Sequence, residues 1–221
     1  FMQTISSNTL EDTMYYKNIP VLIYRIQYPS FTSTCSFSSA QSINRYYASA
    51  AREQEEYCRT VLYSQAVDNA QYLPVNQPPF NSYQFFSDYQ VTFNSCCITS
   101  LYLEQYTYLG GAHGTTLRIS HTWNFFTGGQ LQLKDFYPAS FSIPEDLLDS
   151  VERQAAERLA LSPASYFDDY GELIRKNFRP ENFYLRPAGA VVYYQQYDIA
   201  PYAAGIPEFL IPFAGTEQKM G

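Results

Sequence analysis

One long amphipathic segment constrains the fold of this chain more than any other feature. From Ser39 to about Ala70, mostly apolar side chains recur at three- and four-residue steps, which is the spacing of one face of an α-helix. The stripe consists of Ile43, Tyr47, Ala50, Gln54, Cys58, Val61 and Gln65. Ser38 and Gln41 match a capping box and predict the start of the helix. Because only one face is apolar, we expect the helix to lie on a sheet.

The segments on both sides of this helix have the composition of β-strands. Residues 14–28 are rich in Ile, Val and Tyr and predict one or two strands that close at Pro29. Residues 83–133 alternate apolar and polar side chains, and the glycine pairs at 110–111 and 128–129 favour hairpin turns. We therefore expect an antiparallel meander there. One of its strands is expected to bury Leu117, Ile119, His121, Trp123 and Phe125 on a single face.

The C-terminal half predicts two shorter helices and several short strands. Ser142 and Glu145 match a second capping box, whose helix ends before Pro163, and a third helix is expected at about residues 169–178. Short strands are expected at residues 183–185, 190–194 and 208–212. The whole pattern predicts the α+β class, with antiparallel sheets, one long helix after the first strands and two shorter helices in the C-terminal half.

Charge and composition narrow the classes of partner. The net charge is −7, from 14 Lys and Arg against 21 Asp and Glu, which argues against nucleic acid and favours a cationic protein. The 22 Tyr, 16 Phe and 16% charged residues suit an extracellular domain. No apolar run approaches the roughly 20 residues of a membrane span, so membrane attachment would need an anchor outside this sequence.

The four cysteines leave two interpretations open. Cys35, Cys58, Cys96 and Cys97 lack the spacing of a zinc site. Cys58 lies on the helical stripe and one of Cys96 and Cys97 would face inward from a strand, which favours buried free thiols. The alternative is a disulfide that joins Cys35 either to Cys58 or to one of the adjacent Cys96 and Cys97.

No combination of residues predicts catalysis. His121 lies in the apolar register of its strand and is expected to be a hydrogen-bonded core residue. His113 lies in a glycine-rich loop, where we expect it to hold the turn in place. The adjacent carboxylates Glu145-Asp146 and Asp168-Asp169 stand at helix starts, where the helix dipole favours them. We therefore expect no catalytic residues, no metal, no cofactor and no enzymatic activity.

Aromatic side chains are the one abundant resource for binding. Their rings provide large contact areas at little cost in rotamer entropy. Most of them should be core residues, and a binding face is expected among the remainder. The candidate binding residues are Tyr108, His113, Tyr193, Tyr194, Tyr197 and Tyr202.

Three stretches of the sequence occur together in a known family. They are residues 108–114 (YLGGAHG), residues 127–137 (TGGQLQLKDFY), and residues 182–185 (NFYL) continuing to residues 197–209 (YDIAPYAAGIPEF). In this order they resemble the RsiV-like extracytoplasmic family, whose paired domains of unknown function occur in the anti-sigma factor RsiV and ahead of the catalytic domain of the peptidoglycan deacetylase PdaC.

The resemblance implies a domain plan, a location and a function. Residues 10–115 would form the first domain and residues 116–213 the second, packed together as one compact unit. In that family, RsiV binds lysozyme outside the cell, and PdaC-type copies lie beside peptidoglycan. The chain is thus expected to be extracytoplasmic, either secreted or anchored at the cell surface. It would recognise lysozyme or a similar cationic wall-degrading enzyme or, alternatively, peptidoglycan or another carbohydrate.

Overall fold

The chain divides into two units that interleave along the sequence. The structure is a computed structural model that describes residues 2–72 and 79–213. Unit 1 comprises Phe1–Gln90, Leu103–Leu117 and Phe125–Gly128, and unit 2 comprises Val91–Tyr102, Arg118–Asn124 and Gly129–Gly221. The expected domain boundary between residues 115 and 116 stays a prediction. None of the helices in the described ranges combines the length and the apolar character needed to cross a membrane.

Unit 1 begins with a long hairpin of β1 (Thr4–Tyr16) and β2 (Ile19–Thr32). Lys17 and Asn18 form its turn with φ angles of 46° and 66°, as a two-residue type I′ turn requires. One or two strands were expected and two are present, but the expected limits are wrong, because β1 begins at Thr4 and β2 continues past Pro29. Pro29 is tolerated because β2 pairs with the next strand only over Leu22–Ile26.

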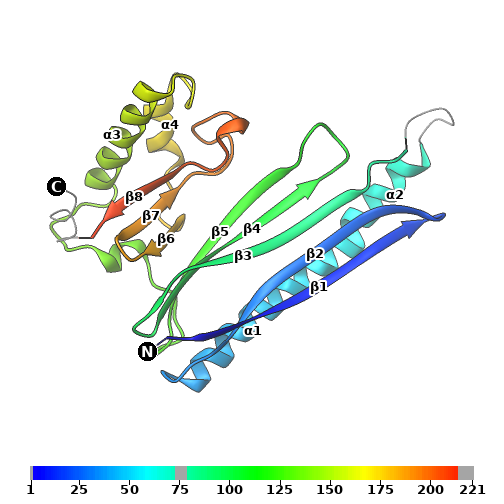
Figure 1. Ribbon diagram of the computed structural model, residues 1–221, viewed down its shortest axis with the longest axis horizontal. Coiled ribbons are helices and arrows are strands. Elements are labelled where there is room, and N and C mark those ends of the chain that lie inside the picture. Colours follow the sequence, from blue (N-terminus) through cyan, green and yellow to red (C-terminus); the bar gives the residue numbers. More distant parts are fainter. Residues whose placement is uncertain (1, 73–78, 214–221) are drawn as a thin grey trace. The chain divides into compact units, whose positions relative to one another are not determined.

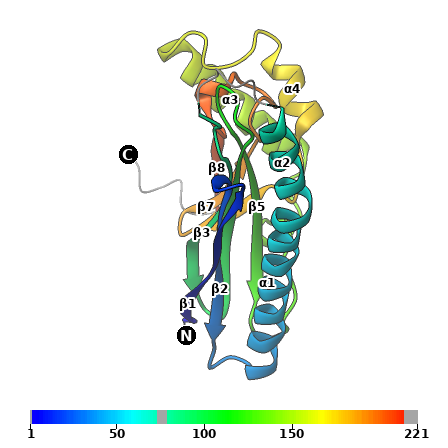
Figure 2. The ribbon, with the colours of Figure 1, turned by 90° about the vertical axis from the view of Figure 1, so that its right-hand side faces the viewer.

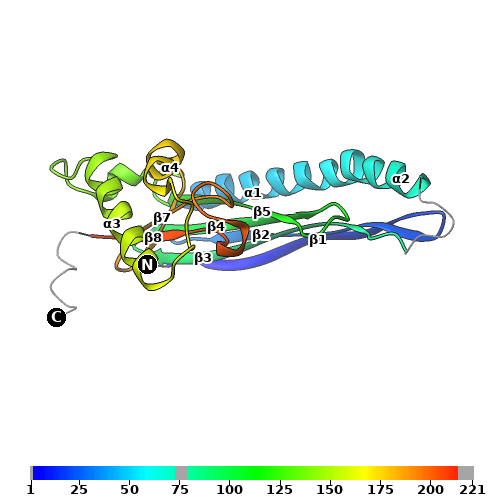
Figure 3. The ribbon, with the colours of Figure 1, turned by 90° about the horizontal axis from the view of Figure 1, so that it is seen from above.

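The long helix is confirmed as α1 (Phe37–Tyr57), a π-helical turn at Cys58–Leu62 and α2 (Tyr63–Gln71). Figures 2 and 3 show it running along one face of the strands of unit 1. The predicted cap is wrong. The helix begins earlier than the apolar stripe indicates, and the Ser36 hydroxyl, not that of Ser38, accepts a hydrogen bond from the Ser39 N–H at 3.2 Å.

The π-helical turn shifts the buried face of the helix by one residue. The Tyr63 N–H donates to the Cys58 carbonyl, five residues back, so the turn contains one residue more than an α-helical turn. Beyond it, Leu62 and Ala66 are buried, whereas the expected Val61 and Gln65 are exposed. The α-helical period predicts the stripe correctly only as far as Cys58.

The helix returns the chain to the same sheet. β3 (Tyr83–Ser95) lies parallel to β2, from Leu22↔Tyr83 to Ile26↔Ser87, because a helical crossover brings the chain back to the same end of the sheet. β4 (Ile98–Tyr108) and β5 (Thr115–Asn124) follow, and the strand order is β1-β2-β3-β4-β5. The sheet is mostly antiparallel, as predicted, with this one parallel pair.

The core of unit 1 lies between the helix and β2 and β3. Its buried members are Val21, Leu22, Tyr24, Ile26, Ala51, Cys58, Leu62, Ala66, Tyr83 and Phe85. Asn44 of α1 ties the helix to β2, since its amide accepts from the Phe31 N–H at 2.7 Å and donates to the Phe31 carbonyl at 2.9 Å.

The expected register of β5 is wrong over its first half. Leu117 and Ile119 are 46% and 36% exposed, whereas Arg118 and Thr122 are 7% and 1% exposed. Farther along, Trp123 and Phe125 are buried as expected. The prediction placed the apolar side chains of the first half of β5 inside, because it rests on the rule that buried positions are apolar. Here the buried side chains are polar, and hydrogen-bonding or charged partners satisfy them.

Unit 2 combines two helices with a three-stranded sheet. The helices are α3 (Glu145–Leu161) and α4 (Tyr170–Asn177), and the antiparallel strands are β6 (Phe183–Arg186), β7 (Gly189–Tyr193) and β8 (Glu208–Pro212) in that order. Short 3₁₀ helices lie at Leu133–Phe136 (η2) and Tyr202–Ala204 (η3). The two shorter helices of the prediction are confirmed.

The second predicted capping box is wrong in its partners. No side chain caps α3 at its N-cap residue, Pro144. Instead, the Ser142 N–H donates to the Asp146 carboxylate at 2.7 Å. The helix therefore begins three residues after Ser142, with Glu145 as its first residue.

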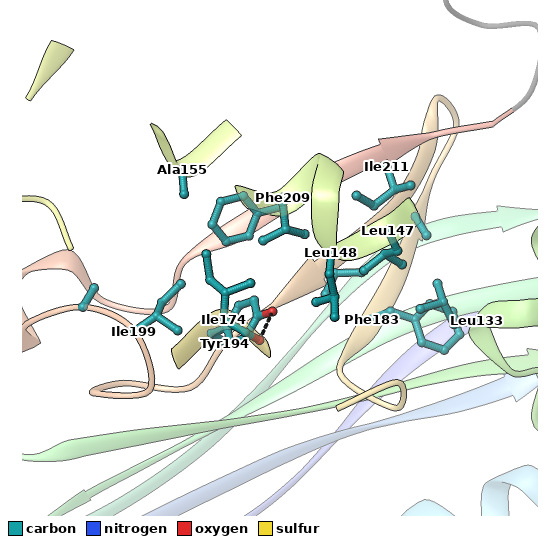
Figure 4. Close-up of a cluster of buried hydrophobic side chains, with 14 of the residues drawn as sticks. Leu133, Leu147, Leu148, Ala155, Ile174, Phe183, Tyr194, Ile199, Phe209 and Ile211 are labelled. Atoms are coloured by element: carbon teal, nitrogen blue, oxygen red, sulfur yellow. Dashed lines mark hydrogen bonds between the residues drawn. The ribbon is translucent and has the colours of Figure 1, made fainter. Parts of the chain in front are cut away.

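The core of unit 2 lies between its two helices and its sheet. α3 contributes Leu147, Leu148, Val151 and Ala155, and α4 contributes Ile174. Figure 4 shows several of these side chains beside residues of the sheet and of the following loop, among them Phe183, Tyr194, Ile199, Phe209 and Ile211. The Tyr194 hydroxyl donates to the Ile174 carbonyl at 2.9 Å, so this buried hydroxyl is satisfied.

Two leucines of α3 test this packing. Leu147 is fully buried and Leu161 is 88% exposed. Leu147→Ala is expected to lower the free energy of unfolding by about 3 kcal/mol, because it removes buried methyl groups and leaves a cavity. Leu161→Ala, the same chemical change, should alter it by less than about 0.5 kcal/mol. Urea denaturation measures both, and equal effects would contradict this account of the core.

Candidate binding site

The candidate residues Tyr193 and Tyr194 are core residues, each only 1% exposed. The Tyr193 hydroxyl lies 2.9 Å from the Ser120 hydroxyl, and the Tyr194 hydroxyl is bound to Ile174. Burial raises the pKa of Tyr193 to about 12. Their buried rings offer little surface to a ligand. The binding role expected of these two residues stays a prediction.

Tyr197 and Tyr202 form an aromatic pair in the segment between β7 and β8. Their ring centroids lie 5.9 Å apart, and Tyr197 is 51% exposed. Tyr197 has a φ of 67°, in the left-handed region, and Tyr202 begins η3. These two candidates are therefore brought together, with one ring well exposed.

Tyr108 and His113 belong to unit 1: Tyr108 is the last residue of β4, and His113 lies in the loop between β4 and β5. The Tyr108 hydroxyl donates to the Gly111 carbonyl at 2.9 Å, and the His113 Nδ1 lies 3.1 Å from the Gly114 carbonyl oxygen. Both contacts are local to the loop, in keeping with a role in shaping the turn.

The surroundings of Arg118 could not be predicted from any sequence pattern. This buried guanidinium pairs with the Glu208 carboxylate and lies over the Tyr102 ring at 4.1 Å, with the rings of Tyr193 and Tyr184 at 5.4 Å and 6.0 Å. Burial and the neighbouring Glu208 raise the pKa of Tyr184 well above its ordinary value. Cation–π contacts and one ion pair thus stabilise a charge that would otherwise be costly to bury.

A cavity of about 500 Å³ in unit 2, here named the polar pocket, combines apolar and polar walls. Its lining consists of residues 120–122, residues 130–134, Ile143, Pro180, Glu181 and Phe183. Leu133 and Phe183 are 2% and 5% exposed and also belong to the core of unit 2. The volume is within the range of small-molecule sites.

His121 lines this pocket rather than the core. It is half-buried, with its ring 5.8 Å from that of Trp123, so the expected core position is wrong. Burial lowers the pKa of His121 to about 4. Its imidazole is therefore neutral at physiological pH and offers one hydrogen-bond donor and one acceptor.

The cysteines divide between the two interpretations. Cys35 and Cys97 are disulfide-bonded, whereas Cys58 is a buried and Cys96 an exposed free thiol. The expectation that Cys96 or Cys97 faces inward from a strand is wrong, because both form the β3–β4 turn with φ angles of 51° and 62°. Burial, with a smaller contribution from Glu55, raises the pKa of Cys58 to about 12.

The acidic residues of α3 form surface ion pairs. Arg175 of α4 contacts Glu145 at 3.2 Å, Asp149 at 2.8 Å and Glu152 at 2.6 Å. Within residues 2–72 and 79–213, no group of three or more His, Cys, Asp or Glu side chains is placed to hold a metal ion.

Two known family models match separate parts of this chain. Residues 16–116 match the family model described as "Deacetylase PdaC", and residues 144–214 match "Protein of unknown function (DUF3298)". The chain belongs to this paired-domain family. The function of the family is unknown, and its matches indicate no catalytic activity. No curated protein matches the chain.

Two solved members of the DUF3298 family share the fold. A protein from Bacteroides fragilis is 22% identical, with a TM-score of 0.71 over 99% of this chain and 94% of that one. A protein from Pseudomonas aeruginosa is 18% identical, with a TM-score of 0.57 over 95% of this chain and 89% of that one. At these identities the likeness concerns the fold alone.

The pKa of His121 predicts a pH dependence of stability. The unfolded chain, with an ordinary histidine pKa near 6.5, binds a proton that the folded protein takes up only near pH 4. Stability is thus unaffected by this group above pH 6.5 and falls by up to about 3 kcal/mol as the pH drops toward 4. His121→Gln should remove this part of the loss, measured by urea denaturation between pH 7 and pH 4.5.

The matched control is His113→Gln, in an exposed loop position. It should remove none of the loss assigned to His121, because the buried imidazole of His121 is still present. If the His121→Gln protein lost stability between pH 6.5 and pH 4.5 as steeply as the wild type, the burial of a neutral imidazole would be refuted.

Proposed function

We propose that this chain is an extracytoplasmic recognition domain without catalytic activity, which binds a cationic wall-degrading enzyme such as lysozyme. The observation that carries the proposal is the acidic surface of α3 and α4. Residues 145–177 contain eight acidic and four basic side chains, and the whole chain has a net charge of −7.

Much of this negative charge faces solvent. The side chains of Glu145 and Asp149 are 68% and 70% exposed, although both contact Arg175. Asp168 and Glu172 are exposed as well. One arginine among three carboxylates leaves a local excess of negative charge, and such an excess speeds association with a basic protein at low salt.

Family membership supports the same proposal. In the family that this sequence resembles, RsiV binds lysozyme outside the cell, and the family model over residues 16–116 takes its name from the deacetylase PdaC. A surface location also suits the disulfide-bonded Cys35 and Cys97, because disulfides persist in oxidising compartments.

Calorimetric titration with lysozyme at low and at moderate salt tests the proposal. Saturable binding is expected, weaker at the higher salt concentration, because screening reduces attraction between exposed charges. The double variant Asp168→Asn, Glu172→Gln should weaken binding about fivefold at low salt, as two rim charges are lost.

The control is a second double variant that changes the net charge by the same amount at a site outside α3 and α4. Glu53→Gln with Glu56→Gln neutralises two exposed carboxylates of α1 and should change the affinity much less. Absence of heat at both salt concentrations would refute lysozyme binding. Equal weakening by both double variants would refute the assignment to α3 and α4.

A second candidate function, binding to peptidoglycan, is favoured by the aromatic pair of Tyr197 and Tyr202, of which Tyr197 is exposed, since sugar rings stack on exposed aromatic faces. In sedimentation with purified peptidoglycan, the wild-type protein would then pellet, and Tyr197→Ala would reduce the pelleted fraction severalfold. Tyr72→Ala, which removes a tyrosine of unit 1 that is 82% exposed, should have no effect. A wild-type protein that stays in the supernatant contradicts this function.

A further inference from the structure

Two opposite charges line the polar pocket without pairing with each other. Lys134 and Glu181 are both exposed at its walls. In the described part of the chain, neither the Lys134 ammonium nor the Glu181 carboxylate forms an ion pair or a side-chain hydrogen bond. A ligand in the pocket therefore meets one cation and one anion, both available.

The remaining walls contribute apolar surface and neutral polar groups. Leu133 and Phe183 form buried apolar surface. His121 contributes its neutral imidazole, and Gln130 contributes an amide. The Gln132 side chain, by contrast, is engaged with the backbone of η2, where it accepts a hydrogen bond from the third residue.

These groups discriminate among classes of ligand. An anion would gain Lys134 but approach Glu181, and a cation would meet the reverse conflict, because a like charge near a ligand opposes binding. A neutral polar molecule such as a sugar would leave both charges without a partner and would gain neither charge-assisted contact. A molecule with one ammonium and one carboxylate satisfies both side chains.

We propose that the polar pocket binds a small zwitterion of the amino-acid class, either a free amino acid or a short peptide. Its carboxylate pairs with Lys134 and its ammonium with Glu181, while its apolar side chain lies against Leu133 and Phe183. The Gln130 amide supplies a hydrogen bond. This site lies outside the acidic helical face proposed to meet lysozyme, so the two proposals can fail independently.

Ligand-observed NMR and calorimetry with four probes test the proposal. L-leucine and the dipeptide alanyl-alanine are the zwitterions, N-acetyl-leucine amide is the blocked analogue, and N-acetylglucosamine is the neutral sugar. At least one zwitterion is expected to bind saturably, and the blocked analogue and the sugar should each bind at least about tenfold more weakly.

Variants of the two charges locate the binding. Lys134→Gln and Glu181→Gln should each weaken binding of the zwitterion about tenfold or more, since each leaves one ligand charge unpaired. The matched controls Lys176→Gln and Glu157→Gln, at exposed positions outside the pocket, should leave it unchanged. Thermal melting verifies that all four variants are folded.

Three results would overturn the proposal. They are no saturable binding of either zwitterion, binding of N-acetylglucosamine as tight as that of the zwitterion, and equal affinity in the Lys134 and Glu181 variants and the wild type. The second result would instead assign the pocket to a carbohydrate. Lysozyme titration of the Lys134→Gln and Glu181→Gln proteins, expected to resemble the wild type, keeps this test separate from that of the proposed function.

Discussion

The burial of Arg118 is the constraint on which the architecture of unit 2 depends. A guanidinium withdrawn from water costs several kcal/mol unless ion pairs and hydrogen bonds replace its hydration. Here Glu208 of β8 provides the ion pair, and the ring of Tyr102 lies 4.1 Å from the charge. The backbone of Arg118 is held too, because the Gln195 amide accepts from its N–H at 2.9 Å and donates to its carbonyl at 2.6 Å. β5 is thereby fixed in one register.

That register determines which side chains reach the polar pocket. A slip of one residue would turn every side chain of a strand to the opposite face, so the position of Arg118 also sets those of Ser120, His121 and Thr122. A second polar contact reinforces it: the hydroxyls of Thr122 and Ser100 lie 2.8 Å apart, and Ser100 accepts from the Leu185 N–H at 2.8 Å. The pocket wall is thus tied to both β4 and β6, and such fixed walls lower the entropic cost of binding.

Periodicity explains how far the sequence predicts this fold. The helix from Phe37 to Gln71 and the two shorter helices were predictable because each has a repeating apolar face. The extra residue in the π-helical turn was not, since one hydrogen bond to Cys58 decides it. The first ten residues of β1, from Thr4 to Thr13, were missed because a largely polar edge strand carries little apolar signal. The parallel β2–β3 pair follows from the helical crossover, a rule of topology rather than of composition.

The candidate site was harder to predict than the fold because it is assembled from separate segments. His121 comes from β5, Lys134 from η2 and Glu181 from the residues before β6, and no spacing in the sequence links them. The oxidation state of each cysteine also depends on contacts between residues that are distant in the sequence. The same is true of the register of β5. Local patterns predict elements, whereas sites of this kind require the tertiary arrangement.

Many of the tyrosines are core residues in the structure. Tyr24, Tyr47, Tyr184, Tyr193 and Tyr194 are among the largest fully buried side chains. Their hydroxyls are used internally: that of Tyr24 donates to Glu55 at 2.8 Å and accepts from Arg59 at 2.6 Å. A buried tyrosine therefore fills volume as phenylalanine does and also pins a neighbouring polar group. Because so many rings serve the core, the proposed recognition relies chiefly on charge placement and on the polar pocket, although some rings, among them Tyr72 and Tyr197, stay exposed.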